Sequence, residues 1–167
     1  MAVVKIIRKI NDIAAICLMS VLAICVIAQV ICRYALGAPL TWSEELARYM
    51  QIWMVMLGSA VMMRKGGHLA IDLVTASLPP KVKRVTDFLV YISIIVFFSI
   101  VVWQGVPVSI NALKQHSPAM QINMGYVYMA LPVGGALVLM ETVVRFVRFI
   151  KTGSPNEPGA KKAESAE

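Results

Sequence analysis

Long apolar runs, separated by short polar clusters, dominate the chain. Four windows lack Asp, Glu, Lys and Arg: residues 13–32, 49–63, 88–113 and 115–140. A helix needs roughly 20 predominantly apolar residues to cross the hydrocarbon core of a bilayer. The pattern predicts an all-α integral membrane protein with four transmembrane helices, at about residues 11–34, 41–64, 86–111 and 122–148.

The second window is the exception, because its 15 residues are too few to cross a bilayer. Charged clusters bracket it on both sides: Trp42, Glu44, Glu45 and Arg48 before it, and Arg64, Gly66, His68 and Asp72 after it. Part of these clusters must therefore lie at membrane depth. A charge at a helix centre there costs about 2.5–3.5 kcal/mol and usually faces protein or serves a function.

Composition and charge agree with this class and give an orientation. Hydrophobic residues make up 59% of the chain, charged residues 15%, and the mean hydropathy is +0.74. All 16 Lys and Arg residues except Arg33, Arg48 and Lys114 fall on one side of the predicted topology. Basic residues near helix ends stay in the cytoplasm, so both termini are expected there. The net charge of +7 then reflects topology, and nothing indicates a basic domain for binding nucleic acid.

The connections between the predicted helices differ in length. Residues 37–39 form a short outer turn, after which Thr41 and Glu44 form a possible capping box. The connection over residues 64–87 is the longest. Its apolar residues followed by Lys81, Lys83 and Arg84 suggest a short amphipathic segment on the membrane surface, in contact with anionic lipids. Helices and connections form a membrane domain over residues 1–151, and residues 152–167 are expected to be a disordered cytoplasmic tail.

A polar stripe is predicted along one face of the second helix. Glu44, Arg48, Gln51, Gly58 and Met62 fall within about one third of the helix circumference. Glu44 and Arg48 form a favourable i,i+4 pair. The stripe either faces another protein surface or simply marks the membrane boundary.

The tryptophans add to this picture. Trp42 is typical of an interfacial aromatic belt, whereas Trp53 and Trp103 are expected to pack between helices or against a partner.

Candidate chemistry is sparse. His68 and His116 are predicted on opposite sides of the membrane, and Cys17, Cys25 and Cys32 are expected to be packing residues. No motif of an enzyme, a cofactor or a metal site is recognised. The first and third windows hold no acidic residue, and Glu141 lies near the inner end of the fourth helix. A complete proton-coupled carrier is therefore not expected, and an accessory subunit explains the chain better.

Two half-motifs then indicate a family. The pattern Trp42-x-Glu44-Glu45-x-x-Arg48, an apolar run, and Arg64-x-Gly66-x-His68-x-x-x-Asp72 resembles the small membrane subunit of tripartite ATP-independent periplasmic (TRAP) transporters. The resemblance implies a multi-pass protein of the bacterial cytoplasmic membrane that pairs with a large multi-span permease subunit and works with a periplasmic substrate-binding protein. It also implies sodium-driven uptake of organic acids such as dicarboxylates or sialic acid, with the transport site in the large subunit.

The small subunit would then be a scaffold. Trp42, Glu44, Glu45 and Arg48 would contact the partner or orient the second helix near the periplasmic face, and Arg64, Gly66, His68 and Asp72 would close the inner end. Three alternatives stay open. A small multidrug-type exporter would need a membrane-buried carboxylate, which the first helix lacks, and a cytochrome-like carrier would need histidines within its helices. The third alternative is an orphan four-helix subunit.

Overall fold

The fold is helical, in a computed structural model that describes residues 2–38, 40–65 and 80–152. The helices are α1 (Ala2–Tyr34), α2 (Thr41–Lys65), α4 (Pro80–Ala112), α5 (Met124–Tyr128) and α6 (Ala130–Thr152). Four stretches are long and apolar enough to cross a membrane, the last made by α5 and α6 together: Val4–Tyr34, Thr41–Arg64, Val82–Ala112 and Met124–Ile150. The prediction of four transmembrane helices is confirmed.

Two helices begin earlier than expected. α1 begins at Ala2 rather than near residue 11, and α4 begins at Pro80 rather than near residue 86. A helix satisfies its own backbone hydrogen bonds, so it can continue beyond the apolar stretch while long basic side chains reach toward water. Pro80 fits the first position of α4, where its missing N–H costs nothing.

The predicted interfacial segment and the predicted tail differ from the structure or lie outside the residues that it describes. Lys83 and Arg84, expected in an interfacial segment, belong to the first turns of α4. Most of that segment lies outside the described residues, together with Gly66, His68 and Asp72. The tail after Thr152 also lies outside them.

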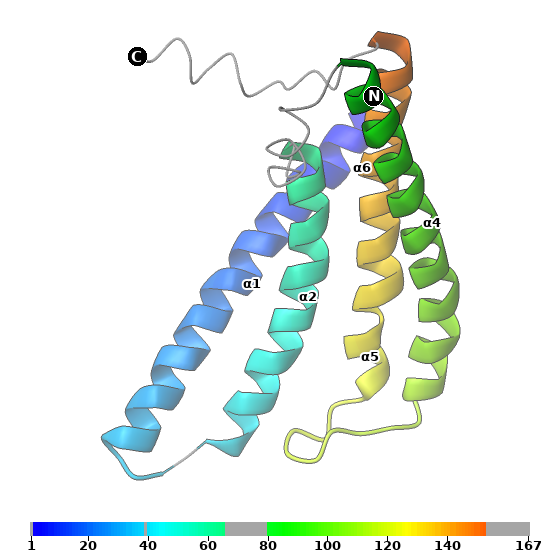
Figure 1. Cartoon of the computed structure of the whole chain (residues 1–167). Helices are drawn as coiled ribbons and strands as arrows, with labels where there is room; N and C mark the ends of the chain where they lie inside the picture. The colour runs from blue at the N-terminus through cyan, green and yellow to red at the C-terminus, as the bar shows by residue number, and fades with distance from the viewer. Residues whose placement is uncertain (1, 39, 66–79, 153–167) are drawn as a thin grey trace, which may run out of the picture.

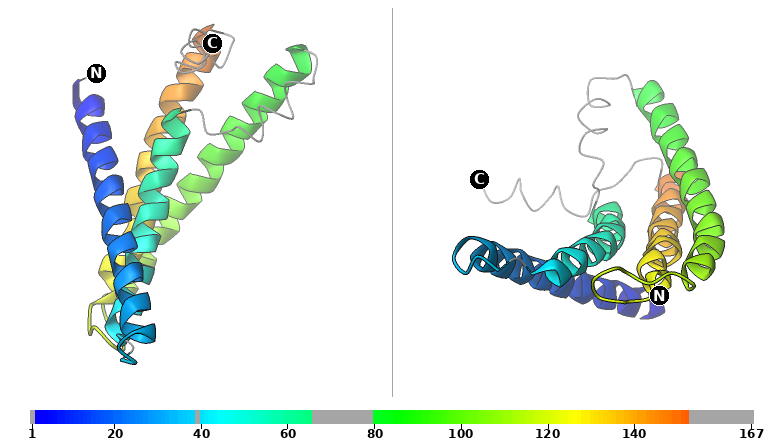
Figure 2. Two further views of the ribbon diagram at one scale, coloured as in Figure 1. Left: turned by 90° about the vertical axis from the view of Figure 1, so that its left-hand side faces the viewer. Right: turned by 90° about the horizontal axis from the view of Figure 1, so that it is seen from below.

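The helices are arranged as an open arc, in the order α1, α2, α6, α4. Helix α2 packs against α1 and α6, while α4 packs against α6 and α5. Figure 2 shows this arc from below, with α4 at one edge. In Figure 1 the start of α1 and the end of α6 lie at one end of the bundle, here called the terminal end. The end of α1, the start of α2 and residues 113–123 lie at the other, the loop end.

Small residues allow the central helices to approach closely. A Cβ atom at Gly134 of α6 would lie 2.5 Å from the Cβ of Met56 in α2. Nearby, Ala60 and Met63 of α2 and Val138 of α6 form a buried cluster. Close backbone approach of this kind drives helix association in lipid, where no hydrophobic effect between helices operates.

The fourth span is broken between α5 and α6. Pro132 has no N–H, so the regular helical hydrogen bond to the carbonyl of Tyr128 cannot form. Next to this break the indole Nε1 of Trp53 in α2 donates a hydrogen bond to the carbonyl oxygen of Tyr126, at 3.2 Å. Trp53 therefore lies between helices, one of the two positions expected for it.

Candidate functional site

At the loop end, Glu45 of α2 holds the connection between α4 and α5. Its carboxylate accepts hydrogen bonds from the Ser117 hydroxyl at 2.7 Å and from the backbone N–H groups of Ala119 and Met120, both at 3.1 Å. Ser117 is fully buried. Hydrogen bonds that a carboxylate accepts are roughly twice as strong as neutral ones. Glu45 thus fixes this loop to α2.

The same loop is also braced from within. Asn123 accepts a hydrogen bond from the Gly125 N–H at 2.9 Å, which caps α5, and donates one to the Leu113 carbonyl at 2.6 Å. The backbones of His116 and Asn123 pair in an isolated antiparallel bridge, which leaves the His116 side chain exposed. The loop is therefore a defined surface at this end of the bundle.

The neighbouring residues of the first half-motif behave differently from the prediction. Glu44 accepts a hydrogen bond from Gln29 of α1 at 3.0 Å. The expected ion pair between Glu44 and Arg48 is not formed within the described part of the chain. An i,i+4 pair contributes only about 0.2–0.5 kcal/mol, so a contact with another helix can replace it.

The expected capping box is also wrong. Thr41 is the first residue of α2, and the described bonds at this helix start come instead from Ser43, whose hydroxyl donates to the Leu40 carbonyl at 2.8 Å. The side chains of Trp42 and Arg48 remain exposed. In the first half-motif, Glu44 and Glu45 thus accept hydrogen bonds from other segments of the chain, whereas the side chains of Trp42 and Arg48 are exposed.

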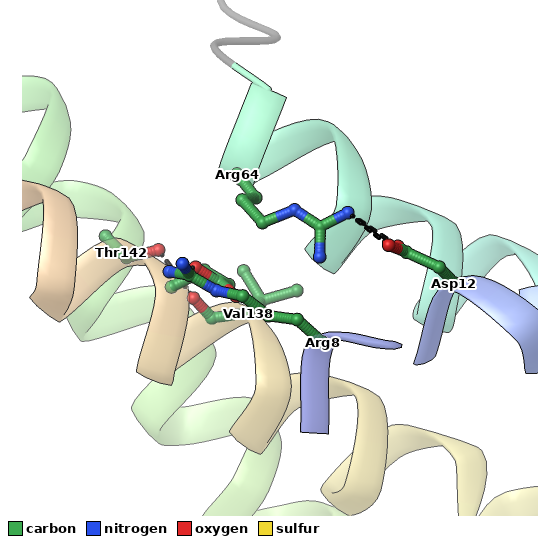
Figure 3. A network of polar contacts seen from close by, with 6 residues as sticks. Arg8, Asp12, Arg64, Val138 and Thr142 are labelled. Atoms are coloured by element: carbon green, nitrogen blue, oxygen red, sulfur yellow. Dashed lines mark hydrogen bonds and ion pairs between the residues drawn. The ribbon is translucent and has the colours of Figure 1, made fainter. Parts of the chain in front are cut away.

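At the terminal end, two ion pairs connect α1 to its neighbours. Arg8 donates from Nε to Glu141 Oε1 at 2.7 Å and from Nη2 to Oε2 at 2.5 Å. This bidentate pair joins α1 to α6. Arg64 of α2 donates from Nη2 to both oxygens of Asp12, at 2.6 and 2.8 Å. Figure 3 shows both arginines beside one another, with Val138 and Thr142 of α6 close by.

A buried amide adds a third contact from the same part of α1. Asn11 is 7% exposed, and its Nδ2 donates to the Leu57 carbonyl of α2 at 3.2 Å. Because Arg8, Asn11 and Asp12 fall on adjacent turns of α1, one helix face reaches both α2 and α6. Arg64, a predicted site residue, thus pairs with Asp12, a contact that the sequence did not predict.

The pairing of Arg8 with Glu141 was missed. In the sequence, Arg8 counts only as one of the basic residues on the cytoplasmic side, and Glu141 only as an acidic residue near the inner end of the fourth helix. A possible signal was that each charge sits close to an apolar stretch, where an unpaired charge is costly. The signal does not identify which charges pair.

Other candidate chemistry remains limited in the part of the chain that the structure describes. No group of three or more His, Cys, Asp or Glu there could hold a metal ion. Cys17, Cys25 and Cys32 are free thiols. Trp103 is 79% exposed, so the expectation that it packs between helices of this chain is wrong. Its alternative, contact with a partner, stays a prediction.

Comparison with known proteins gives consistent matches. A family model described as the DctQ component of tripartite ATP-independent periplasmic transporters matches residues 22–152. The chain is 30% identical over 132 residues to the sialic acid TRAP transporter permease protein SiaT of Haemophilus influenzae (strain 86-028NP). The aligned residues cover 79% of this chain and 21% of SiaT. The chain therefore spans about a fifth of SiaT.

Shorter proteins match over more of their own length. Identity is 25% over 147 residues to the sialic acid TRAP transporter small permease protein SiaQ of Vibrio cholerae, covering 88% of this chain and 85% of SiaQ. Identity is 27% over 119 residues to the C4-dicarboxylate TRAP transporter small permease protein DctQ of Rhodobacter capsulatus, covering 70% of this chain and 52% of that relative.

Proposed function

Because the chain belongs to the DctQ component family of TRAP transporters, as a small accessory subunit that crosses the bacterial inner membrane several times, we propose that it is a scaffold for a separate large permease subunit. In this proposal the large subunit carries out transport, and a periplasmic binding protein delivers the substrate. The small subunit itself has no catalytic role.

The observation that carries this proposal is the ion pair between Glu141 and Arg8. This buried carboxylate, 3% exposed, is bound on both oxygens by Arg8. A proton or cation site needs a carboxylate with an oxygen free to bind the ion, whereas both oxygens of Glu141 here accept from the guanidinium of Arg8. Glu141 therefore serves the assembly of the bundle, as expected for a scaffold rather than a small exporter.

The relatives support a larger assembly. Since the chain corresponds to about a fifth of SiaT, the remaining length of that permease indicates a large companion for the present chain. Names of relatives refer to sialic acid and C4-dicarboxylate transporters. An organic acid is the proposed class of substrate, and a sodium gradient the proposed driving force.

The proposed orientation places the loop end in the periplasm. Among the described residues, Arg33, Arg48 and Lys114 lie near this end, whereas Lys5, Arg8, Lys9, Arg64, Arg145 and Arg148 lie toward the terminal end. Trp42 and Arg48, exposed beside the braced loop, would then contact the large subunit or the binding protein. Glu44 and Glu45 would act by orienting α2.

Reconstitution tests the proposal. The large permease encoded with this chain would be purified with and without it, placed in liposomes, and supplied with its binding protein and a labelled organic acid. We expect copurification of both subunits, and sodium-driven uptake that is lost without the small chain. Unaided transport by the small chain, or full uptake without it, would contradict the proposal.

A further inference from the structure

Helix α4 carries an exposed line of polar side chains, here called the α4 polar stripe, which consists of Ser93, Gln104 and Asn111. All three side chains are exposed. They are separated by about three and two helical turns, given ~3.6 residues per turn, and so share one face. Trp103 lies next to this face and is 79% exposed.

These polar groups have no hydrogen-bond partner within the described residues. Ser99 of the same helix donates to the carbonyl four residues earlier, that of Ile95, at 2.7 Å. Ser20, Ser59 and Ser109 do the same. This local bond lets a serine face lipid without an unsatisfied hydroxyl. Ser93 does not make it, and the side-chain amides of Gln104 and Asn111 are also without a partner.

The stripe extends deep into the span. At ~1.5 Å per residue, Gln104 lies about 12 Å from Ala112, where α4 ends, and Ser93 lies about 28 Å from it. Both are within the apolar stretch Val82–Ala112. Lipid tails offer no hydrogen bonds, so polar groups at such depth are satisfied by protein or by a water-filled cavity.

The position of α4 leaves this face open. The helix lies at the edge of the arc and contacts α6 and α5, as Figures 1 and 2 show. Exposed residues in mid-span are mostly apolar on both edge helices, but on α1 the exposed Ser20 satisfies its own hydroxyl at the Ile16 carbonyl, at 3.0 Å. Such a surface suits lipid, whereas the α4 polar stripe suits a protein partner.

We propose that the α4 polar stripe binds a transmembrane helix of the large permease subunit, and that this helix presents hydrogen-bonding side chains or carbonyl groups to it. The inference rests on the proposed function and adds the face through which the subunits meet. A large partner is favoured over a second copy because the matching segment of SiaT is one part of a much longer permease chain. Polar residues are known to join helices across such interfaces.

Photo-crosslinking tests the contact. A benzophenone amino acid would be placed at Gln104 or, as a matched control, at Val106, two residues later and on about the opposite flank of α4. Val106 is 45% exposed, so the probe fits there as well. In membranes that hold the complete transporter, we expect an adduct with the large subunit from Gln104 and little or none from Val106.

Three results would overturn this proposal. These are equal adducts from Gln104 and Val106, an adduct with a second copy instead of the large subunit, or no adduct from Gln104 in a complex that still copurifies. Absence of copurification in the unmodified protein would instead contradict the proposed function. The two failures are therefore distinguishable.

Substitution gives an independent readout. The double variant S93A with Q104L removes the two deep polar groups and should fold in lipid at least as well as the natural chain. We expect it to lose most of the copurified large subunit. The control S99A removes a hydroxyl that is already satisfied by Ile95 and should keep it. Equal copurification and uptake in both variants would contradict the proposal.

Discussion

Replacing Arg8 with Ala should destabilise the bundle far more than replacing Arg64 with Ala. Both arginines pair with a carboxylate of another helix at the terminal end, but the burial of the carboxylate differs. The side chain of Glu141 is 4% exposed, and that of Asp12 is 39% exposed. Removing one partner of a buried pair costs about 3–5 kcal/mol, whereas an exposed pair contributes about 0–1 kcal/mol.

The expected sizes follow from these exposures. The side chain of Arg8 is 23% exposed, so we expect R8A to lower the free energy of unfolding by about 3 kcal/mol, the low end of the range for a buried pair. This is about a hundredfold loss in the folded-to-unfolded ratio. R64A should lose less than about 1 kcal/mol. Unfolding in mixed micelles with increasing sodium dodecyl sulfate, followed by circular dichroism, would measure both free energies.

A double replacement shows whether R8A is destabilising because Glu141 is left as an unpaired buried charge or because packing is lost. R8M together with E141L replaces the ion pair by apolar side chains, and such changes are often neutral or stabilising. We therefore expect the double variant to recover most of the stability lost in R8A. Equal losses in R8A and R64A, or no recovery in the double variant, would refute the reasoning from burial.

Three further predictions concern contacts between helices. Glu45→Ala removes three hydrogen bonds to the loop over residues 113–123, so hydrogen exchange of that loop should become faster while the exchange of α1 stays unchanged. Trp53→Phe keeps an aromatic ring but removes the hydrogen bond to α5; we expect a loss of about 1 kcal/mol in the same unfolding assay. Gly134→Ala places a Cβ 2.5 Å from a side-chain atom of α2 and should cost about 1–3 kcal/mol. Its control, Gly58→Ala, meets no atom within 4 Å and should leave stability nearly unchanged.

The sequence was sufficient to predict the four spans, because apolar length is a property of each segment alone. It was not sufficient to predict helix ends beyond the apolar runs. The first transmembrane helix was expected to begin near residue 11, yet α1 begins at Ala2 and continues through Lys5, Arg8 and Lys9. Backbone hydrogen bonding inside a helix does not depend on the polarity of its side chains, so hydropathy marks the membrane more reliably than it marks the helix.

Contacts between spans were harder to predict, since they depend on the tilt and rotation of each helix. Glu44 was expected to pair with Arg48, four residues away, but it meets Gln29 of α1 instead. Glu45 was among the predicted site residues, although nothing local indicated that it would hold the loop after α4. Arg8 and Glu141 pair across 133 residues of sequence, and no local pattern indicates which distant charges pair.

The length of α1 has a consequence for the lipid around the protein. The whole helix Ala2–Tyr34, at ~1.5 Å per residue, is about 50 Å long, while its uncharged stretch over residues 13–32 is about 30 Å long and matches the ~30 Å hydrocarbon core of a bilayer. The first turns of α1, which carry Lys5, Arg8 and Lys9, therefore extend beyond the hydrocarbon core to the level of the lipid head groups. Because the Arg8 pair fixes only the first turns of α1 to α6, the tilt of the remaining helix is set by α2 and by the membrane. In a bilayer with shorter acyl chains the apolar stretch of α1 would exceed the core and the helix would tilt, so we expect the α1–α2 contact to be strained first.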